Sequence, residues 1–192
     1  MLDALPATVS RMTAISENDT ARAPYRFNPL PWAIAAGLLL LPLLAMQFTD
    51  SVDWTASDFV IMGALLFAAC SAYEIGARMS RNHWYRFAVA IAVVSGFLMI
   101  WINLAVGIIG SEDNAENLLF GAVLLVAIAG SAVSGFRPEG MFRAFMATAA
   151  AQVAVGVYAL FAGSPEGVFL SEFFAAMWLV SAGLFRKAAQ DR

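Results

Sequence analysis

The sequence has few charged residues, a single cysteine and a single histidine. Charged residues make up 13% of the 192 positions, against about 25% in a soluble globular domain. One cysteine excludes a disulfide framework and a cysteine-ligated metal, and one histidine excludes a multi-histidine metal or haem centre within the chain. With a net charge of −3, nucleic-acid binding is excluded as well. We therefore expect no metal and no other cofactor. The charged residues are also too few to cover the surface of a globular protein in water.

Apolar residues are abundant instead. They make up 61% of the chain, and the mean hydropathy is +0.74. A bilayer core of about 30 Å needs roughly 20 apolar residues per helix, and backbone groups in lipid must pair within the segment. We therefore expect an all-α integral membrane bundle of six transmembrane helices, arranged as three hairpins. The expected spans are 30–48, 58–78, 87–110, 117–136, 143–162 and 166–185.

Basic residues are confined to one side of these spans. None of the lysines and arginines falls in the first, third or fifth loop. Because basic segments stay in the cytoplasm during insertion, both termini are predicted to be cytoplasmic. The polar segment 1–24 is predicted to be a flexible cytoplasmic tail, and 25–192 the six-helix transmembrane domain. The basic residues are Arg11, Arg22, Arg26, Arg78, Arg81, Arg86, Arg137, Arg143, Arg186, Lys187 and Arg192.

The three expected hairpins resemble one another in sequence. Tyr25-Arg26-Phe27 opens the first and Tyr85-Arg86-Phe87 opens the second. Either the hairpins descend from a triplicated unit, or the rules of membrane insertion alone make them alike.

Acidic residues gather on the opposite, outer side. Thr55-x-x-Asp58 and Asp113-x-x-Glu116 have the spacing of a capping box, and Ser164-Pro165-Glu166 has that of a capped helix start. The alternative is a site for a hard cation. The outer acids are Asp50, Asp53, Asp58, Glu112, Asp113, Glu116, Glu166 and Glu172.

Two polar residues are expected at similar depth below the outer surface. Glu172 and Asn103 each lie about seven residues from the outer end of their spans, roughly 10 Å inside. Ionisable groups at such depth mark candidate functional sites. We expect Glu172 and Asn103 at the floor of a small outward pocket, or otherwise as hydrogen-bonding contacts between helices. The walls of this pocket would be formed by Trp101 and Tyr158, and its mouth by Asp50, Asp53 and Asp58.

Other polar residues are expected to have structural roles. Glu74 has Arg78 one turn later, which predicts an ion pair within the helix. Gln152 lies near the middle of the fifth span, where it is expected to bond another helix or to line a pocket. Cys70 is expected to be a buried, inert packing residue. Small residues in the fourth and fifth spans permit close helix packing, within the chain or with a second copy or membrane-protein partner.

Two stretches resemble a family of small bacterial polytopic inner-membrane proteins without assigned activity. They are Leu41-Pro-Leu-Leu-Ala-Met-Gln-Phe-Thr-Asp-Ser-Val-Asp-Trp-Thr55 with Asp58-Phe59, and Trp101-Ile-Asn-Leu-Ala-Val-Gly-Ile-Ile-Gly110. The resemblance covers roughly residues 35–120. It implies location in the bacterial inner membrane and carries no expectation about substrate or cofactor.

The sequence favours a non-enzymatic membrane protein, an accessory or assembly module. The short loops leave no room for an extramembrane domain, and no catalytic motif is recognisable, so no catalytic residue is assigned. The alternative is a transporter or channel for a small cation or solute, because an acidic outer mouth attracts cations. A membrane enzyme is the third and least favoured interpretation.

Overall fold

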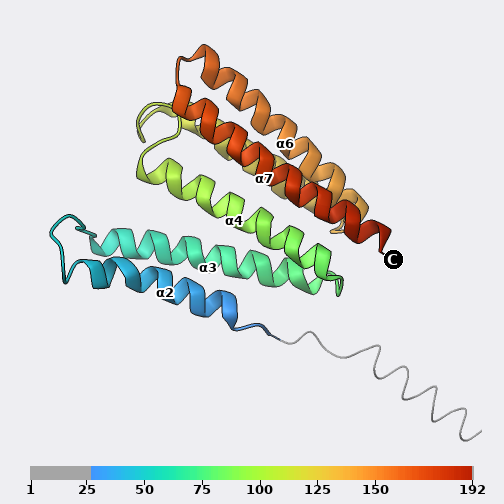
Figure 1. Cartoon of the computed structure of the whole chain (residues 1–192), viewed down its shortest axis with the longest axis horizontal. Helices are drawn as coiled ribbons and strands as arrows, with labels where there is room; N and C mark the ends of the chain where they lie inside the picture. Colours follow the sequence, from blue (N-terminus) through green and yellow to red (C-terminus); the bar gives the residue numbers. More distant parts are fainter. Residues whose placement is uncertain (1–26, 192) are drawn as a thin grey trace, which may run out of the picture.

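The computed structural model describes residues 27–191, and in this part the chain is all-α. Figure 1 shows successive helices running in opposite directions, with α6 and α7 inclined to α2 and α3. The predicted tail at 1–24 lies outside the described residues. The helices are α2 (Leu30–Ala45), α3 (Ala56–Arg78), α4 (His83–Ala105), α5 (Leu118–Val133), α6 (Pro138–Phe161) and α7 (Pro165–Gln190), and the 3-10 turn η1 (Ala115–Asn117) precedes α5.

The loops divide between the two ends of the bundle. The loops α2–α3, α4–α5 and α6–α7 lie together at one end, and the turns α3–α4 and α5–α6 lie at the other with the C-terminus (Figure 1). The first end has the outer acids and is called the acidic end below. The second has the described lysines and arginines and is called the basic end.

Five helices are long and apolar enough to cross a membrane, which makes the chain a multi-pass membrane protein by helix length and hydropathy. They are α3, α4, α5 together with η1, α6 and α7. Helix α2 is shorter, because it ends at Ala45 rather than at residue 48 as predicted. Its 16 residues cover about 24 Å, less than the bilayer core.

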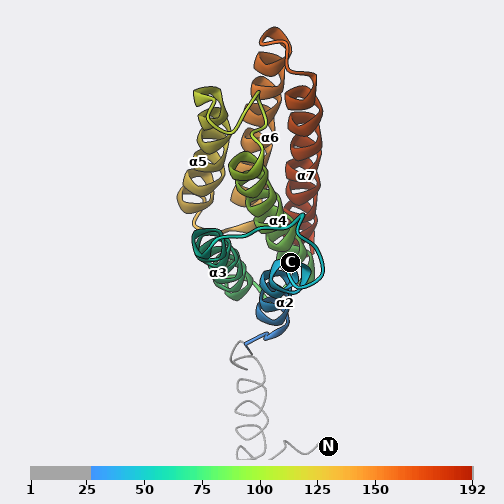
Figure 2. The same ribbon diagram turned by 90° about the vertical axis from the view of Figure 1, so that its left-hand side faces the viewer.

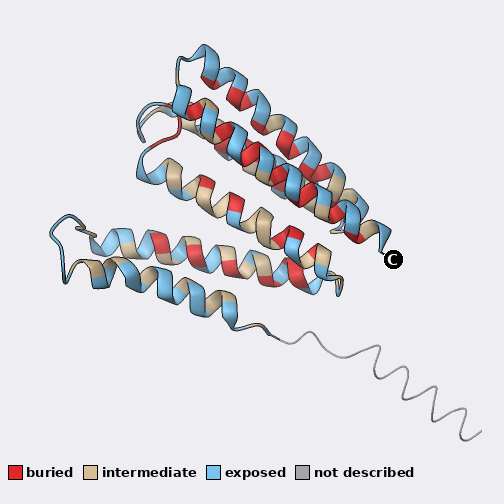
Figure 3. Ribbon diagram, in the orientation of Figure 1, coloured by how far each residue is buried: buried red, intermediate tan, exposed pale blue. Residues whose placement is uncertain are grey.

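The helices do not pack equally. Helix α6 packs most extensively on α7, and α7 in turn on α4. Figure 3 shows buried positions along α6 and α7 and none along α2. The described core is therefore centred on α4, α6 and α7, with α2 and α3 at its side.

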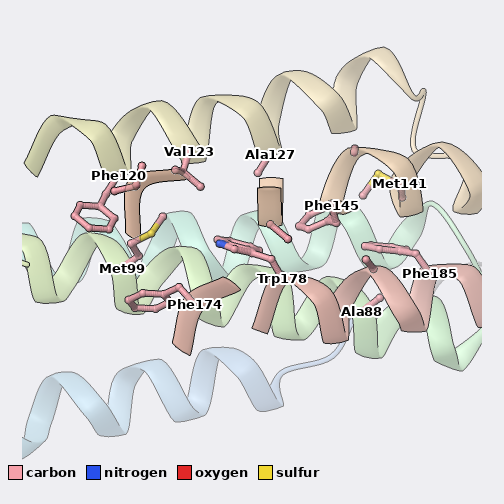
Figure 4. Packing of buried hydrophobic residues seen from close by; sticks show 14 of the residues in the cluster. Ala88, Met99, Phe120, Val123, Ala127, Met141, Phe145, Phe174, Trp178 and Phe185 are labelled. Carbon is pink, nitrogen blue, oxygen red and sulfur yellow. The ribbon is translucent and has the colours of Figure 1, made fainter. Parts of the chain in front are cut away.

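Large aromatic side chains fill this core. Trp178 is 1% exposed and lies 5.8 Å from Phe145, ring centroid to centroid, and Phe145 lies 5.2 Å from Phe185. In Figure 4 these rings follow one another along the bundle. Tyr85 closes the series at the basic end, with its ring edge-on to Phe185 at 5.0 Å.

The prediction that one span covers 87–110 was wrong at both ends. Helix α4 begins at His83, because the Asn82 side chain accepts hydrogen bonds from the Trp84 and Tyr85 amides. It ends at Ala105, and Gly107 and Gly110 then adopt positive φ angles of 72°. The sequence stays apolar beyond the end of the helix, because Ile108 and Ile109 are buried in the loop that follows.

Two asparagines organise this loop. The Asn117 side chain accepts from the Ile108 and Ile109 amides, at 3.0 and 2.9 Å, and donates to the Ser111 carbonyl. Asn114 donates to the Ile109 carbonyl. Their hydrogen bonds satisfy backbone groups that would otherwise be buried unpaired.

The helix starts test the predicted caps. The capping box Thr55–Asp58 is confirmed, and so is Ser164, whose hydroxyl accepts from the Gly167 amide. The box starting at Asp113 was wrong, because Asn114 caps η1 instead. Helix α2 begins at Leu30 as predicted, but α6 begins at Pro138 rather than at 143, since a proline suits the first turn of a helix.

Candidate functional site

The candidate functional site is a lateral groove of about 450 Å³ on one side of the bundle. Figure 2, which views the bundle from the acidic end, places α3 and α5 on the same side of α4. Helix α3 packs on α4 and α5 packs mainly on α6, which leaves space between them. The lining residues are Leu65, Ala68, Ala69, Ala72, Ile75, Gly76, Val89, Ala92, Val93, Gly96, Phe97, Ile100, Leu124, Ala127, Ile128, Ser131, Phe136, Met141, Phe145, Trp178 and Phe185.

Small residues create this groove. Ala68, Ala72 and Gly76 follow one another at intervals of four on α3, so they share one face of the helix. Ala92 and Gly96 do the same on α4. Their side chains are too short to fill the space between the helices, and the aromatic core residues form the far wall.

Gly76 sets how closely α3 approaches α4 at the basic end. A Cβ atom added to Gly76 would lie 2.6 Å from Val89 Cγ1, well inside van der Waals contact. Small residues at helix crossings in membranes permit such close approach. The groove therefore begins where the two helices touch and extends from there towards the middle of the bundle.

The turn between α5 and α6 closes the basic end of the groove. Gly135 and Phe136 both have positive φ, 57° and 58°, and for phenylalanine this conformation is strained. The Tyr85 hydroxyl donates a 2.9 Å hydrogen bond to the Phe136 carbonyl, and Tyr85 is fully buried. Tyr85 thus holds the turn that places the Phe136 ring in the groove wall.

Three arginines lie close in sequence to residues that line this end of the groove. Arg78 comes two residues after Gly76, and Arg137 directly follows Phe136. Arg86 lies about one turn before Val89 on α4. In the described residues the basic end has seven basic side chains against the acids Glu74, Glu139 and Asp191. The bases are Arg78, Arg81, Arg86, Arg137, Arg143, Arg186 and Lys187.

A second apolar cavity, of about 340 Å³, lies between α2, α3 and α4. Cys70 lines it, and its thiol donates to the Pro31 carbonyl at 3.5 Å. The prediction of a buried Cys70 is confirmed. Helix α2 has no buried residue, so this cavity is covered only loosely on that side.

The structure places the predicted pocket residues as follows. Glu172 is exposed on α7, and one of its carboxylate oxygens lies 3.2 Å from where a Cβ of Gly156 would be. Asn103 is half-buried and donates from its side chain to the Met99 carbonyl. Its side-chain oxygen is buried and has no partner among the described residues. Neither apolar cavity includes Glu172 or Asn103, and the outward pocket stays a prediction.

The other residues assigned to that pocket have separate contacts. Tyr158 donates to Glu116 Oε1 at 2.9 Å, which connects α6 with η1. Trp101 is 40% exposed and stacks on Phe97. Asp58 accepts from the Thr55 amide and hydroxyl, and Asp50 and Asp53 lie exposed in the preceding loop. In the described part of the chain, no group of three or more histidine, cysteine or acidic residues is arranged to hold a metal ion.

Two predicted polar contacts are present in the helices. Arg78 and the buried Glu74 form the expected ion pair at 3.2 Å. Gln152 is fully buried and accepts a 3.4 Å hydrogen bond from Trp178 Nε1, so it connects α6 with α7. Its side-chain nitrogen has no partner in the described residues.

The groove was not among the sites predicted from the sequence. The signal available was the repeated spacing of small residues on α3, at positions 68, 72 and 76. That spacing predicts a close contact between α3 and another helix. It does not predict that the contact with α4 is limited to Gly76 and leaves a groove beyond it.

No family model, curated protein or solved structure matches the chain. The resemblance of the two stretches to a bacterial membrane-protein family therefore has no support beyond their own residues. What is shown is a helical protein whose described residues include five long apolar helices.

Proposed function

We propose that the chain is a non-enzymatic module of the bacterial inner membrane that holds an apolar membrane component in the groove between α3 and α5. The observation that carries this proposal is the groove itself. Its walls come from several helices, and its lining residues include no titratable side chain. Such a wall stabilises hydrocarbon and offers no carboxylate to a cation; its one hydroxyl, that of Ser131, donates to the Ala127 carbonyl.

The proposal includes six membrane crossings with both termini in the cytoplasm. The separation of acidic from basic loops supports this orientation. Helix α2 is short, but it runs antiparallel to α3 from the basic to the acidic end (Figure 1). Local thinning of the bilayer accommodates a short span. In a Cys70→Ala background, a cysteine at Ser111 should react with an impermeant reagent in intact cells; labelling only after lysis would contradict this topology.

A photoreactive residue in the groove tests the binding function. Ile128 on α5 is 65% exposed and lines the groove, and Leu125 on the same helix is 66% exposed and lines neither apolar cavity. A photoreactive phenylalanine in place of Ile128 should give one defined adduct, detected by mass spectrometry of the purified chain. The same residue in place of Leu125 should give the mixture expected from bulk lipid. Identical adducts at the two positions would contradict the proposal.

The competing function is a transporter or channel with an acidic outer mouth. It is favoured by the seven acids of the described acidic loops and helix starts, which lie at one end without a basic residue among them: Asp50, Asp53, Asp58, Glu112, Asp113, Glu116 and Glu166. Proteoliposomes decide between the two. Cation flux above that of protein-free liposomes, reduced by Glu172→Gln, would support transport and not the groove.

A further inference from the structure

The groove has the length of one membrane leaflet. Its α3 wall runs from Leu65 to Gly76 and its α4 wall from Val89 to Ile100. Eleven steps along a helix correspond to about 17 Å. Half of a bilayer core is about 15 Å thick. Since Gly76 lies two residues before the end of α3, the groove occupies the basic half of the bundle and ends near its middle.

The volume of the groove suits one hydrocarbon chain better than a helix. A helix segment about 17 Å long and about 10–12 Å wide with its side chains takes roughly 1,300–1,900 Å³, several times the groove volume of about 450 Å³. An extended hydrocarbon chain of the same length, with neighbouring atoms about 4 Å away, takes roughly 340 Å³. A partner helix would therefore lie over the groove without filling it.

The charge at the basic end of the groove indicates the headgroup. Phe136 and Gly76 line the groove, and Arg137 and Arg78 are their close neighbours in sequence. Arg78 is paired with Glu74, whereas Arg137 is exposed at the turn, where it lines a polar pocket together with Glu139 and Arg143. Basic pockets between membrane helices on the cytoplasmic side attract anionic lipid headgroups, and each arginine near the surface contributes.

We infer that the groove binds an anionic phospholipid of the leaflet on the basic side, with one acyl chain between α3 and α5 and its phosphate near Arg137. This inference rests on the proposed function and names the component that is held. Apart from the Ser131 hydroxyl the lining side chains are apolar, and arginines follow the lining residues Phe136 and Gly76 in sequence at the end where the phosphate would lie.

Trp178 provides a probe of the groove, because it lines the groove wall and is buried in the core. We would prepare one variant with Trp178 as its sole tryptophan and another with Trp101, which is 40% exposed at the surface. Each is reconstituted in phosphatidylcholine vesicles with a small fraction of lipid brominated on its acyl chains. Brominated phosphatidylglycerol should quench Trp178 more strongly than its mole fraction accounts for. The quenching of Trp101 should follow the mole fraction of the brominated lipid, whichever headgroup that lipid has.

Paired substitutions test the contact with the acyl chain and the contact with the headgroup separately. Ala72→Phe should remove the excess quenching of Trp178 by filling the groove, and Ala64→Phe, on the same helix, should not. Arg137→Gln should reduce the preference for phosphatidylglycerol over phosphatidylcholine about fivefold. The control Arg186→Gln removes an equal charge at the same end, over the Phe142 ring outside the groove, and should reduce it less than twofold.

The outcomes distinguish this inference from the function on which it rests. Equal excess quenching of Trp178 by both brominated lipids would overturn the anionic assignment and leave a lipid-binding groove. Quenching that follows the mole fraction for both, or no quenching, would overturn both. Native mass spectrometry of the wild-type chain compares its binding of the same two lipids without any substitution. Equal retention of the two lipids by the chain would overturn the inference.

Discussion

Helix α6 has ten buried residues and helix α2 has none, although both are strongly apolar. The helices α4, α6 and α7 are joined by interlocked aromatic rings and by hydrogen bonds between helices, such as that of Ser181 with the Ala88 carbonyl. The hairpin of α2 and α3 has fewer contacts with the rest. Lipid is as apolar as the side chains, so burial alone does not drive helices together in a membrane. Close packing and hydrogen bonds do so instead, and they are concentrated in one part of this molecule.

The difference explains where the cavities lie. Both apolar cavities have α3 as a wall, and one of them also has α2. A well-packed core of α4, α6 and α7 forms the rigid side of the groove, and the less firmly packed α3 forms the other. If the groove binds lipid as proposed, the lipid would contact the closely packed core on one side and the less firmly packed α3 on another.

The largest effect should come from removing an aromatic ring from the tightly packed part. Phe185 is fully buried, and Phe169 on the same helix is 72% exposed. Phe185→Ala should lower the free energy of unfolding by about 3 kcal/mol or more, because it leaves a cavity. Phe169→Ala should change it by less than about 0.5 kcal/mol. Equilibrium unfolding in mixed micelles measures both, and equal losses would contradict the division between core and periphery.

A smaller effect is expected where the two parts meet. Gly76→Ala brings a methyl group within 2.6 Å of the Val89 side chain, and overpacking of this kind costs typically 1–3 kcal/mol. Gly63 on the same helix has its nearest neighbour at 3.8 Å, in ordinary contact. Gly63→Ala should therefore be neutral or stabilising. If Gly76→Ala is also neutral, α3 is free to move away from α4 at no cost.

The order and type of the helices could be predicted from sequence, because a bilayer requires long apolar helices with every backbone group paired. Hydropathy did not locate the end of α4. Ile108 and Ile109 are as apolar as the helix before them, and only the positive φ of Gly107 and the Asn117 hydrogen bonds end it. Nor did it predict the groove, because hydropathy contains no information on which helix faces meet. The same limit applies to Glu172 and Asn103, which were assigned to one pocket from depth alone.

A hydrogen bond at the groove end should have a modest effect. Tyr85→Phe removes the donor to the Phe136 carbonyl, and single hydrogen bonds in membrane proteins contribute about 0.6 kcal/mol on average, up to about 1.7. The loss should lie towards the upper value, since the bond also holds a strained turn. Tyr158→Phe removes an exposed hydrogen bond to Glu116 and should cost less. The reverse order in micelle unfolding would show that the turn does not depend on Tyr85.

The smallest effect is expected in α2. Leu41 is 58% exposed, and in a membrane its side chain contacts lipid in both the folded and the unfolded chain. Because lipid-facing contacts are similar in the two states, Leu41→Ala should change the free energy of unfolding by less than about 0.5 kcal/mol. The measurement is the same micelle unfolding, repeated at several protein-to-detergent ratios. A loss above about 1 kcal/mol that grows with this ratio would show that α2 packs against a second copy, and the loosely held hairpin would then be an interface.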